Sequence, residues 1–204
     1  ISADRAPRKR DLELAAEALV RAEELVATNS ARVAEAQASY LFAAGRKAEG
    51  LARAKEAVAF AQDPREKARA EAFVRHLETR RADDVRRQVN QYFLLAQRND
   101  PEAAAAGRRL LGVLTNDIVP LCHLAVQIVS DPRITRRDLP LANDALNQAE
   151  KLAPTNSTRL AVSRAIVLFE TGKEQDGLAR AREALAAAQG EKDKALAEKC
   201  LRTM

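Results

Sequence analysis

Two neighbouring side chains, Cys122 and His123, have the types that could form a nucleophile and its base. They fall in an expected helix, where successive residues point about 100° apart. The thiol and the imidazole therefore cannot easily hydrogen-bond each other. The second cysteine, Cys200, is in neither a CxxC nor a metal-ligand spacing. We expect both cysteines to be reduced and structural.

Other polar groups in the sequence could bind ions. Asp83 and Asp84 could hold a cation, but we expect them to begin a helix, where carboxylates offset the free amide groups. Arg108 and Arg109 could contact phosphate, although they lack aromatic neighbours that stack on bases. His76 stands alone in a mixed-charge segment, and no P-loop, GxGxxG, HExxH, GxSxG or CxxC motif occurs. The sequence predicts no catalytic activity, no metal site and no cofactor.

The composition indicates the fold class. Of the 204 residues 47% are apolar but only 3% aromatic, and the apolar ones are mostly Ala and Leu, strong helix formers. This predicts an all-α protein. The 34 basic and 29 acidic residues are interleaved, which is typical of solvated helix faces rather than of a nucleic-acid surface. We therefore expect no nucleic-acid binding. No apolar run reaches the length of a membrane span, so we expect no membrane insertion either.

The sequence repeats itself at an offset of 127 residues. Residues 11–75 and 138–202 align without gaps and are identical at 33 of 65 positions. Residues typical of turns and helix starts do not fall in register by chance, so an internal duplication is indicated. The coinciding residues of this kind are Thr28, Asn29, Ser30, Gly45 and Gly50 in the first copy and Thr155, Asn156, Ser157, Gly172 and Gly177 in the second.

Each copy is expected to form four helices. The apolar spacing predicts them at 11–25, 31–44, 48–61 and 65–81, and again at 138–152, 158–171, 175–188 and 191–203. The expected caps are Asp11, Asp138, Ser30 and Ser157 at helix starts, with Gly45 and Gly172 at helix ends in the positive-φ conformation.

Residues 82–116 have no second copy. The sequence predicts a helix at 83–98 and another at 102–115, followed by a helix that Pro120 opens. The mixed charges of residues 78–87 indicate a solvated joint before the first of these helices.

The helix–glycine–helix pair with small residues at its crossing resembles the tetratricopeptide repeat (TPR). Two features depart from the family pattern: Gln62 and Gln189 stand where Pro commonly closes the motif, and Gln37 and Arg164 stand where an apolar residue is usual. Residues 121–156 resemble a TPR variant with a lengthened DP…RD loop. The matching residues are Ala38, Leu41, Gly45, Gly50 and Ala57 in the first copy and Ala165, Leu168, Gly172, Gly177 and Ala184 in the second.

The first copy has the equivalent of that variant at residues 1–29, with Ile1 aligned on Ile128. The chain thus starts inside the helix expected to open its first unit, and we interpret it as a fragment of a larger bacterial multi-repeat protein. The resemblance implies a right-handed α-solenoid of about nine antiparallel helices in two duplicated halves. Its expected parts are a first TPR-like unit at 1–81, an unduplicated connector at 82–118 and a second TPR-like unit at 119–204.

The resemblance also implies a function, that of a non-catalytic interaction or scaffold module binding a peptide or partner protein in its concave groove. Arg32 and Arg159 are the expected anchors for an acidic or carboxylate-ended partner, since a guanidinium can hold a carboxylate through two hydrogen bonds. Phe42 and Phe169 could equally face the core. The groove positions carried over from the family are Arg32, Glu35, Ser39 and Phe42 in the first copy and Arg159, Val162, Ile166 and Phe169 in the second.

An alternative is an auxiliary helical-repeat region of a larger enzyme whose catalytic domain lies outside this chain. The residues before Ile1 would distinguish the two hypotheses, because further repeats favour the interaction module and an α/β segment with a catalytic motif favours the enzyme. A basic nucleic-acid binder would need a coherent arginine face, which the sequence does not show. The sequence assigns neither a compartment nor an oligomeric state.

Overall fold

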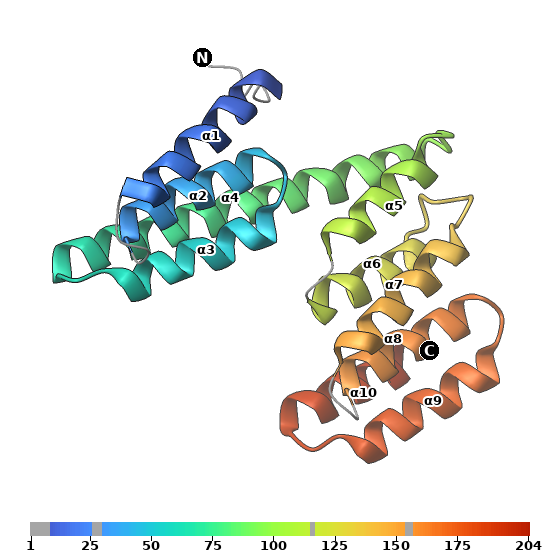
Figure 1. Ribbon diagram of the computed structural model, residues 1–204. Coiled ribbons are helices and arrows are strands. Elements are labelled where there is room, and N and C mark those ends of the chain that lie inside the picture. Colours follow the sequence, from blue (N-terminus) through green and yellow to red (C-terminus); the bar gives the residue numbers. More distant parts are fainter. Residues whose placement is uncertain (1–8, 26–29, 115–116, 154–156) are drawn as a thin grey trace. The chain divides into compact units, whose positions relative to one another are not determined.

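The computed structural model describes residues 9–25, 30–114, 117–153 and 157–204. These residues form ten α-helices and no strand (Figure 1). The all-α class is confirmed, with ten helices where about nine were expected. The helices are α1 (Lys9–Leu25), α2 (Ala31–Ala43), α3 (Lys47–Phe60), α4 (Pro64–Gln97), α5 (Ala103–Val113), α6 (Ile118–Ser130), α7 (Leu139–Leu152), α8 (Thr158–Glu170), α9 (Glu174–Ala187) and α10 (Glu191–Thr203).

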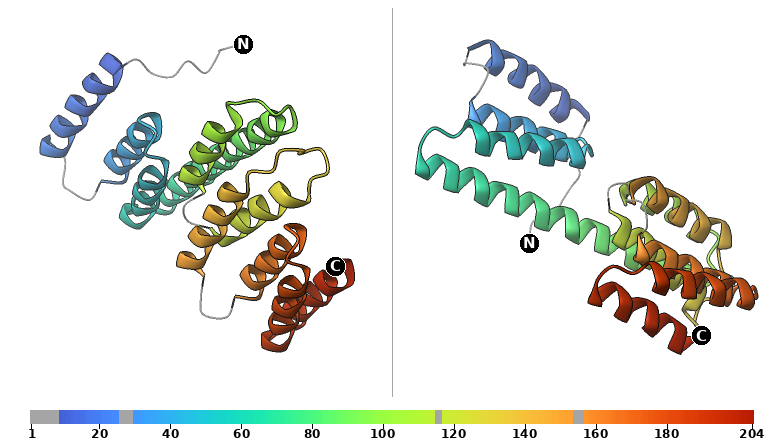
Figure 2. Two further views of the ribbon diagram at one scale, coloured as in Figure 1. Left: turned by 90° about the vertical axis from the view of Figure 1, so that its right-hand side faces the viewer. Right: turned by 90° about the horizontal axis from the view of Figure 1, so that it is seen from below.

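The chain divides into two compact units, Ile1–Asp84 and Val85–Met204, and α4 contributes residues to both. In the first unit α2 packs on α1 and α3, and in the second α8 packs on α6, α7, α9 and α10. Figure 2 shows the antiparallel hairpins α2–α3 and α8–α9, which are the same element in the two sequence copies. Each unit is therefore built around one of the duplicated hairpins.

One continuous helix, α4, of 34 residues, occupies a stretch where the sequence predicted two helices. The expected joint at 78–87 and the expectation that Asp83 and Asp84 begin a helix are therefore wrong. No Gly or Pro interrupts residues 65–97, so nothing in the backbone forces a break. Lys47 of α3 forms an ion pair with Asp84, which favours a carboxylate in this helix interior.

The helix starts follow the expected side-chain caps in part. The carboxylate of Asp138 accepts a hydrogen bond from the Leu141 amide at 3.0 Å, and the Ser157 hydroxyl caps α8. Ser30 precedes α2 but makes no side-chain cap. The cap expected at Asp11 is wrong, because α1 begins before this residue and places it in the first turn, where its charge still suits the helix dipole.

The unduplicated stretch also begins α6 differently from the prediction. The helix starts at Ile118, and the Asp117 carboxylate caps it by accepting a hydrogen bond from the Val119 amide at 2.9 Å. Pro120 lies in the first turn, where its missing N–H costs no helical hydrogen bond. The expectation that Pro120 opens the helix is therefore wrong, because the helix begins two residues earlier, at Ile118.

Glycines shape both duplicated hairpins. Gly45 and Gly172 have φ of 83° and 86° at the ends of α2 and α8, which confirms the expected left-handed conformation. Gly50 and Gly177 lie where the two helices of each hairpin touch. A Cβ on Gly177 would lie 2.8 Å from the Ala165 carbonyl oxygen, and one on Gly50 would lie 2.9 Å from the corresponding oxygen of α2. Only glycine allows this close approach of the two backbones.

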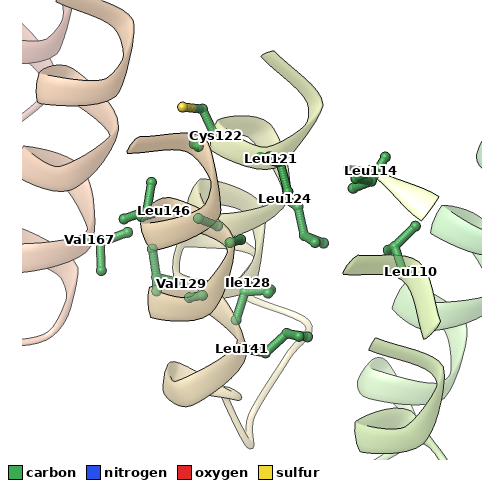
Figure 3. Packing of buried hydrophobic residues seen from close by; sticks show 14 of the residues in the cluster. Leu110, Leu114, Leu121, Cys122, Leu124, Ile128, Val129, Leu141, Leu146 and Val167 are labelled. Carbon is green, nitrogen blue, oxygen red and sulfur yellow. The ribbon is translucent and has the colours of Figure 1, made fainter. Parts of the chain in front are cut away.

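The buried apolar side chains differ in extent between the units. In the first unit they form two small clusters between α2, α3 and α4, built largely from Ala. The second unit has a larger cluster from α4 to α8 and a smaller one between α8, α9 and α10. Figure 3 shows Ile128 and Val129 of α6 and Leu146 of α7 in this cluster, with Leu110 and Leu114 at the right-hand side of the view.

The loop between α6 and α7 is held by its own polar contacts. The Asp131 carboxylate accepts hydrogen bonds from the Arg133 backbone and guanidinium at 2.9 to 3.0 Å, and one from the Gln97 amide at 3.2 Å. The Arg133 hydrogen bonds are the main reason why the pKa of Asp131 falls to about 2. The side chain of Ile134 is buried under the same loop. The loop is thus an ordered part of the second unit.

Candidate partner-binding surface

Two arginines occupy the same place in the two duplicated hairpins. Arg32 is the second residue of α2, Arg159 is the second residue of α8, and both side chains are exposed. Neither guanidinium forms an ion pair with any residue that the structure describes. A guanidinium in this situation is available to a carboxylate from outside the chain.

The other predicted groove residues of the first copy are mostly engaged within the unit. Glu35 is half-buried, and its Oε2 lies 3.3 Å from Nη2 of Arg69 in α4. The exposed Ser39 hydroxyl donates to the Glu35 carbonyl oxygen at 2.9 Å. Phe42 is 8% exposed and belongs to the core with α3 and α4. The structure therefore places Phe42 in the core, the alternative that the sequence left open.

In the second copy the corresponding side chains are apolar. Val162 is 4% exposed and packs in the core between α8, α9 and α10, so little of its side chain is left for a partner. Ile166 and Phe169 are half-buried. Of the four predicted groove residues of α8, the exposed Arg159 and these two half-buried apolar side chains keep surface that a partner can reach.

The two copies differ at Glu35 and Val162 for a reason inside the fold. Arg69, which pairs with Glu35, aligns with Leu196 of α10 at the offset of 127. Leu196 packs against the cluster that contains Val162. An ion pair in one copy thus corresponds to an apolar contact in the other. Glu35 and Val162 therefore pack the hairpin against the helix that follows it, α4 in the first copy and α10 in the second.

Cys122 and His123 are not brought together. Cys122 is buried, and burial raises the pKa of its thiol, although the Ser163 hydroxyl and the charges of Arg159 and Arg164 act in the opposite direction. His123 is exposed. Cys122 and Cys200 are both free and buried, as expected for structural cysteines. A buried thiol with a raised pKa is poorly suited to nucleophilic attack.

A cavity of about 480 Å³ lies between α7, α8 and α9, and the sequence did not predict it. It is lined by Arg164, which contacts Glu150 at 2.7 Å, and by Arg180, which contacts Glu183 at 3.2 Å. Arg164 points about 140° around α8 from Arg159, so this cavity is on a different face of the helix from the predicted groove. Both of its arginines are already paired with carboxylates.

The first copy has an aromatic ring, Phe60, at one of the equivalent positions. Arg53, which aligns with Arg180, hydrogen-bonds Gln37 and Glu56, and its guanidinium lies 5.8 Å from the centroid of the Phe60 ring. Ala187 stands at the position of Phe60 in the second copy. The identical Arg and Glu in both copies are the sequence signal that could have drawn attention to this site, although such pairs are common on helix surfaces.

Within the described parts of the chain, no group of three or more His, Cys, Asp or Glu side chains could hold a metal ion. None of the described helices is both long and apolar enough to cross a membrane. Comparison of the chain with protein-family models, with curated proteins and with solved structures gave no match.

Proposed function

We propose that the chain is a non-catalytic interaction module, a TPR-like helical array that binds a peptide or partner protein with carboxylate groups along α2 and α8. The observation that carries the proposal is the pair of equivalent arginines, Arg32 and Arg159. Both are exposed, stand at the same position of the two duplicated hairpins and have no ion-pair partner among the described residues.

The hairpin geometry supports the likeness to TPR units. Each hairpin turns at a glycine with positive φ and crosses at a second glycine that admits the opposite backbone. Ala38 and Ala165 are fully buried at the crossing, as the family pattern requires of its small residue. Stacked hairpins of this kind bury their faces against neighbours and leave one helix of each pair for binding.

The chemistry of the proposed contact is that of a charge-assisted hydrogen-bonded pair. An arginine fork that holds a carboxylate through two parallel hydrogen bonds contributes roughly 1–3 kcal/mol to affinity. Beside Arg159, the half-buried Ile166 and Phe169 offer apolar surface that a partner side chain can cover. The first copy offers Ser39 at the position of Ile166, so we expect the second copy to contribute more of the affinity.

The test uses a library of short random peptides displayed with free carboxyl termini, followed by titration of selected peptides. We expect enrichment of acidic sequences, and a loss of about tenfold or more in affinity for Arg159→Ala, with a further loss for the double variant with Arg32→Ala. Melting temperatures should stay at the parent value because both side chains are exposed. Arg182→Ala, an exposed arginine of α9, is the matched control.

Selected peptides that bind the double variant as tightly as the parent would refute the proposed site. A fall in melting temperature that accompanies every loss of affinity would instead assign the arginine stems to packing on the helix surface.

A further inference from the structure

α1 carries an aliphatic stripe that the described residues of the first unit leave open. Leu14 is 58% exposed and Ala18 is exposed as well. Ala15, Leu19 and Ala22 are only half-buried. None of these side chains belongs to the two apolar clusters of the first unit.

The same five side chains are covered in the second copy. At the offset of 127 the stripe aligns with α7, and all five residue types are identical. On α7 each is 3% exposed or less. The covered residues are Leu141 at 3%, Ala142 at 0%, Ala145 at 0%, Leu146 at 1% and Ala149 at 0%.

Two helices provide that cover. α6 packs along α7 and brings Ile128 and Val129 beside Leu146 (Figure 3). α5 packs on α7 as well, and there Gly107 is so close that an added Cβ would lie 2.4 Å from Cδ2 of Leu141. The surface on α7 thus fits one aliphatic helix along its Ala residues and a second helix with a small residue opposite Leu141.

We propose that the stripe of α1 is a docking site for a partner protein that presents a helical pair of the α5–α6 kind. The partner supplies an aliphatic helix along Ala15, Ala18 and Ala22 and a Gly or Ala opposite Leu14. The inference follows from shape, because two helices with identical side chains at these positions accept the same covering surface. This site lies on α1 and is independent of the arginine contacts on α2 and α8.

The first arm of the test supplies the cover within the chain. Residues 101–137, which hold α5 and α6, are placed directly before Asp11, and the junction keeps the Arg–Asp sequence found at both 10–11 and 137–138. We expect amide hydrogen exchange in α1 to slow by at least about tenfold relative to the parent chain. Unchanged exchange in α1 would overturn the proposal.

Paired substitutions control this arm. Leu14→Asp should lower the melting temperature of the extended chain but leave that of the parent unchanged. Val20→Asp is the matched control, because Val20 is 55% exposed on α1 and lies about 120° around the helix from Leu14. It should leave both chains unchanged. Equal effects of the two substitutions in the extended chain would overturn the assignment of the stripe.

The second arm tests whether the cover can come from another molecule. A fluorescent peptide of residues 101–138, with Cys122→Ala to prevent oxidation, is titrated into the parent chain. We expect saturable binding that Leu14→Asp weakens by about tenfold or more and Val20→Asp leaves within about twofold. If amide exchange in α1 slows in the first arm but the peptide does not bind, the proposal of a separate partner protein is wrong, and the covering helices must be linked covalently to the chain. Self-association of the parent that Leu14→Asp abolishes would overturn it in favour of a second copy of the chain.

Discussion

Replacing Gly177 by Ala tests the packing of the α8–α9 hairpin directly. The added Cβ would lie 2.8 Å from the Ala165 carbonyl oxygen, 2.9 Å from the Phe169 amide nitrogen and 3.0 Å from the Phe169 Cβ. All three atoms are backbone or Cβ atoms, so no side-chain rotation can relieve the overlap. The two helices must move apart instead, which loosens the contacts that α8 and α9 make with each other.

The magnitude follows from two opposing effects. Overpacking of this kind costs about 1–3 kcal/mol, while Ala in place of Gly in a helix gains up to about 1 kcal/mol. We therefore expect Gly177→Ala to lower the free energy of unfolding by up to about 2 kcal/mol. Gly112 in α5 is the control, because an added Cβ there meets nothing within 4 Å. Gly112→Ala should be neutral or stabilising by up to about 1 kcal/mol.

The assay is urea unfolding followed by circular dichroism at 222 nm. Both glycines belong to the second unit, so the same unfolding transition reports on both variants. The reasoning is refuted if Gly177→Ala is as stable as Gly112→Ala, since the close approach of α8 and α9 would then not exist.

Three further predictions concern single groups. Gly172→Val should lower the free energy of unfolding by about 1–2 kcal/mol. The cause is the backbone φ of 86° alone, since an added Cβ at Gly172 meets nothing within 4 Å. Gly172→Asn should lower it less, and urea titration of both variants checks this. The pKa of Asp131 is lowered to about 2 in the fold, against about 3.9 in an unfolded chain, so its charge stabilises the fold above about pH 4 and this contribution is lost as the pH falls towards 2. Asp131→Asn should therefore melt below the parent at pH 7, with the gap closing by about pH 2, and a constant gap would contradict the contacts of this carboxylate. Cys122 should react with an aromatic disulfide reagent far more slowly than a free thiol, because it is buried and its pKa is raised, and urea should restore fast reaction.

Local signals in the sequence predicted the duplicated hairpins well. Gly45 and Gly172 end α2 and α8 in the expected conformation, and the observed ends of the helices there lie within a residue or two of the predicted ones. These predictions succeeded because a glycine with positive φ acts through its own backbone and needs no distant partner.

Features that depend on distant residues could not be predicted in the same way. The sequence predicts two helices where α4 is continuous, with a break at its charged middle. The ion pair between Lys47 of α3 and Asp84 of α4 joins two helices, so the local sequence around Asp84 gives no sign of it. The cavity between α7, α8 and α9 is lined by residues of all three helices, with Glu150, Arg164 and Ala187 among them. Its lining exists only once these helices have packed together.

The two copies together separate packing from binding more sharply than either does alone. At one contact between helices the two copies changed together: Glu35 and Arg69 form an ion pair where Val162 and Leu196 pack in one apolar cluster. Arg32 and Arg159 stayed identical although no described carboxylate pairs with either. Packing of the arginine stems would tolerate lysine, which has a similar aliphatic stem and the same charge. A bidentate carboxylate contact would not, because lysine lacks the planar fork. The proposed binding role therefore requires that Arg159→Lys lose affinity for a selected acidic peptide while the melting temperature stays at the parent value.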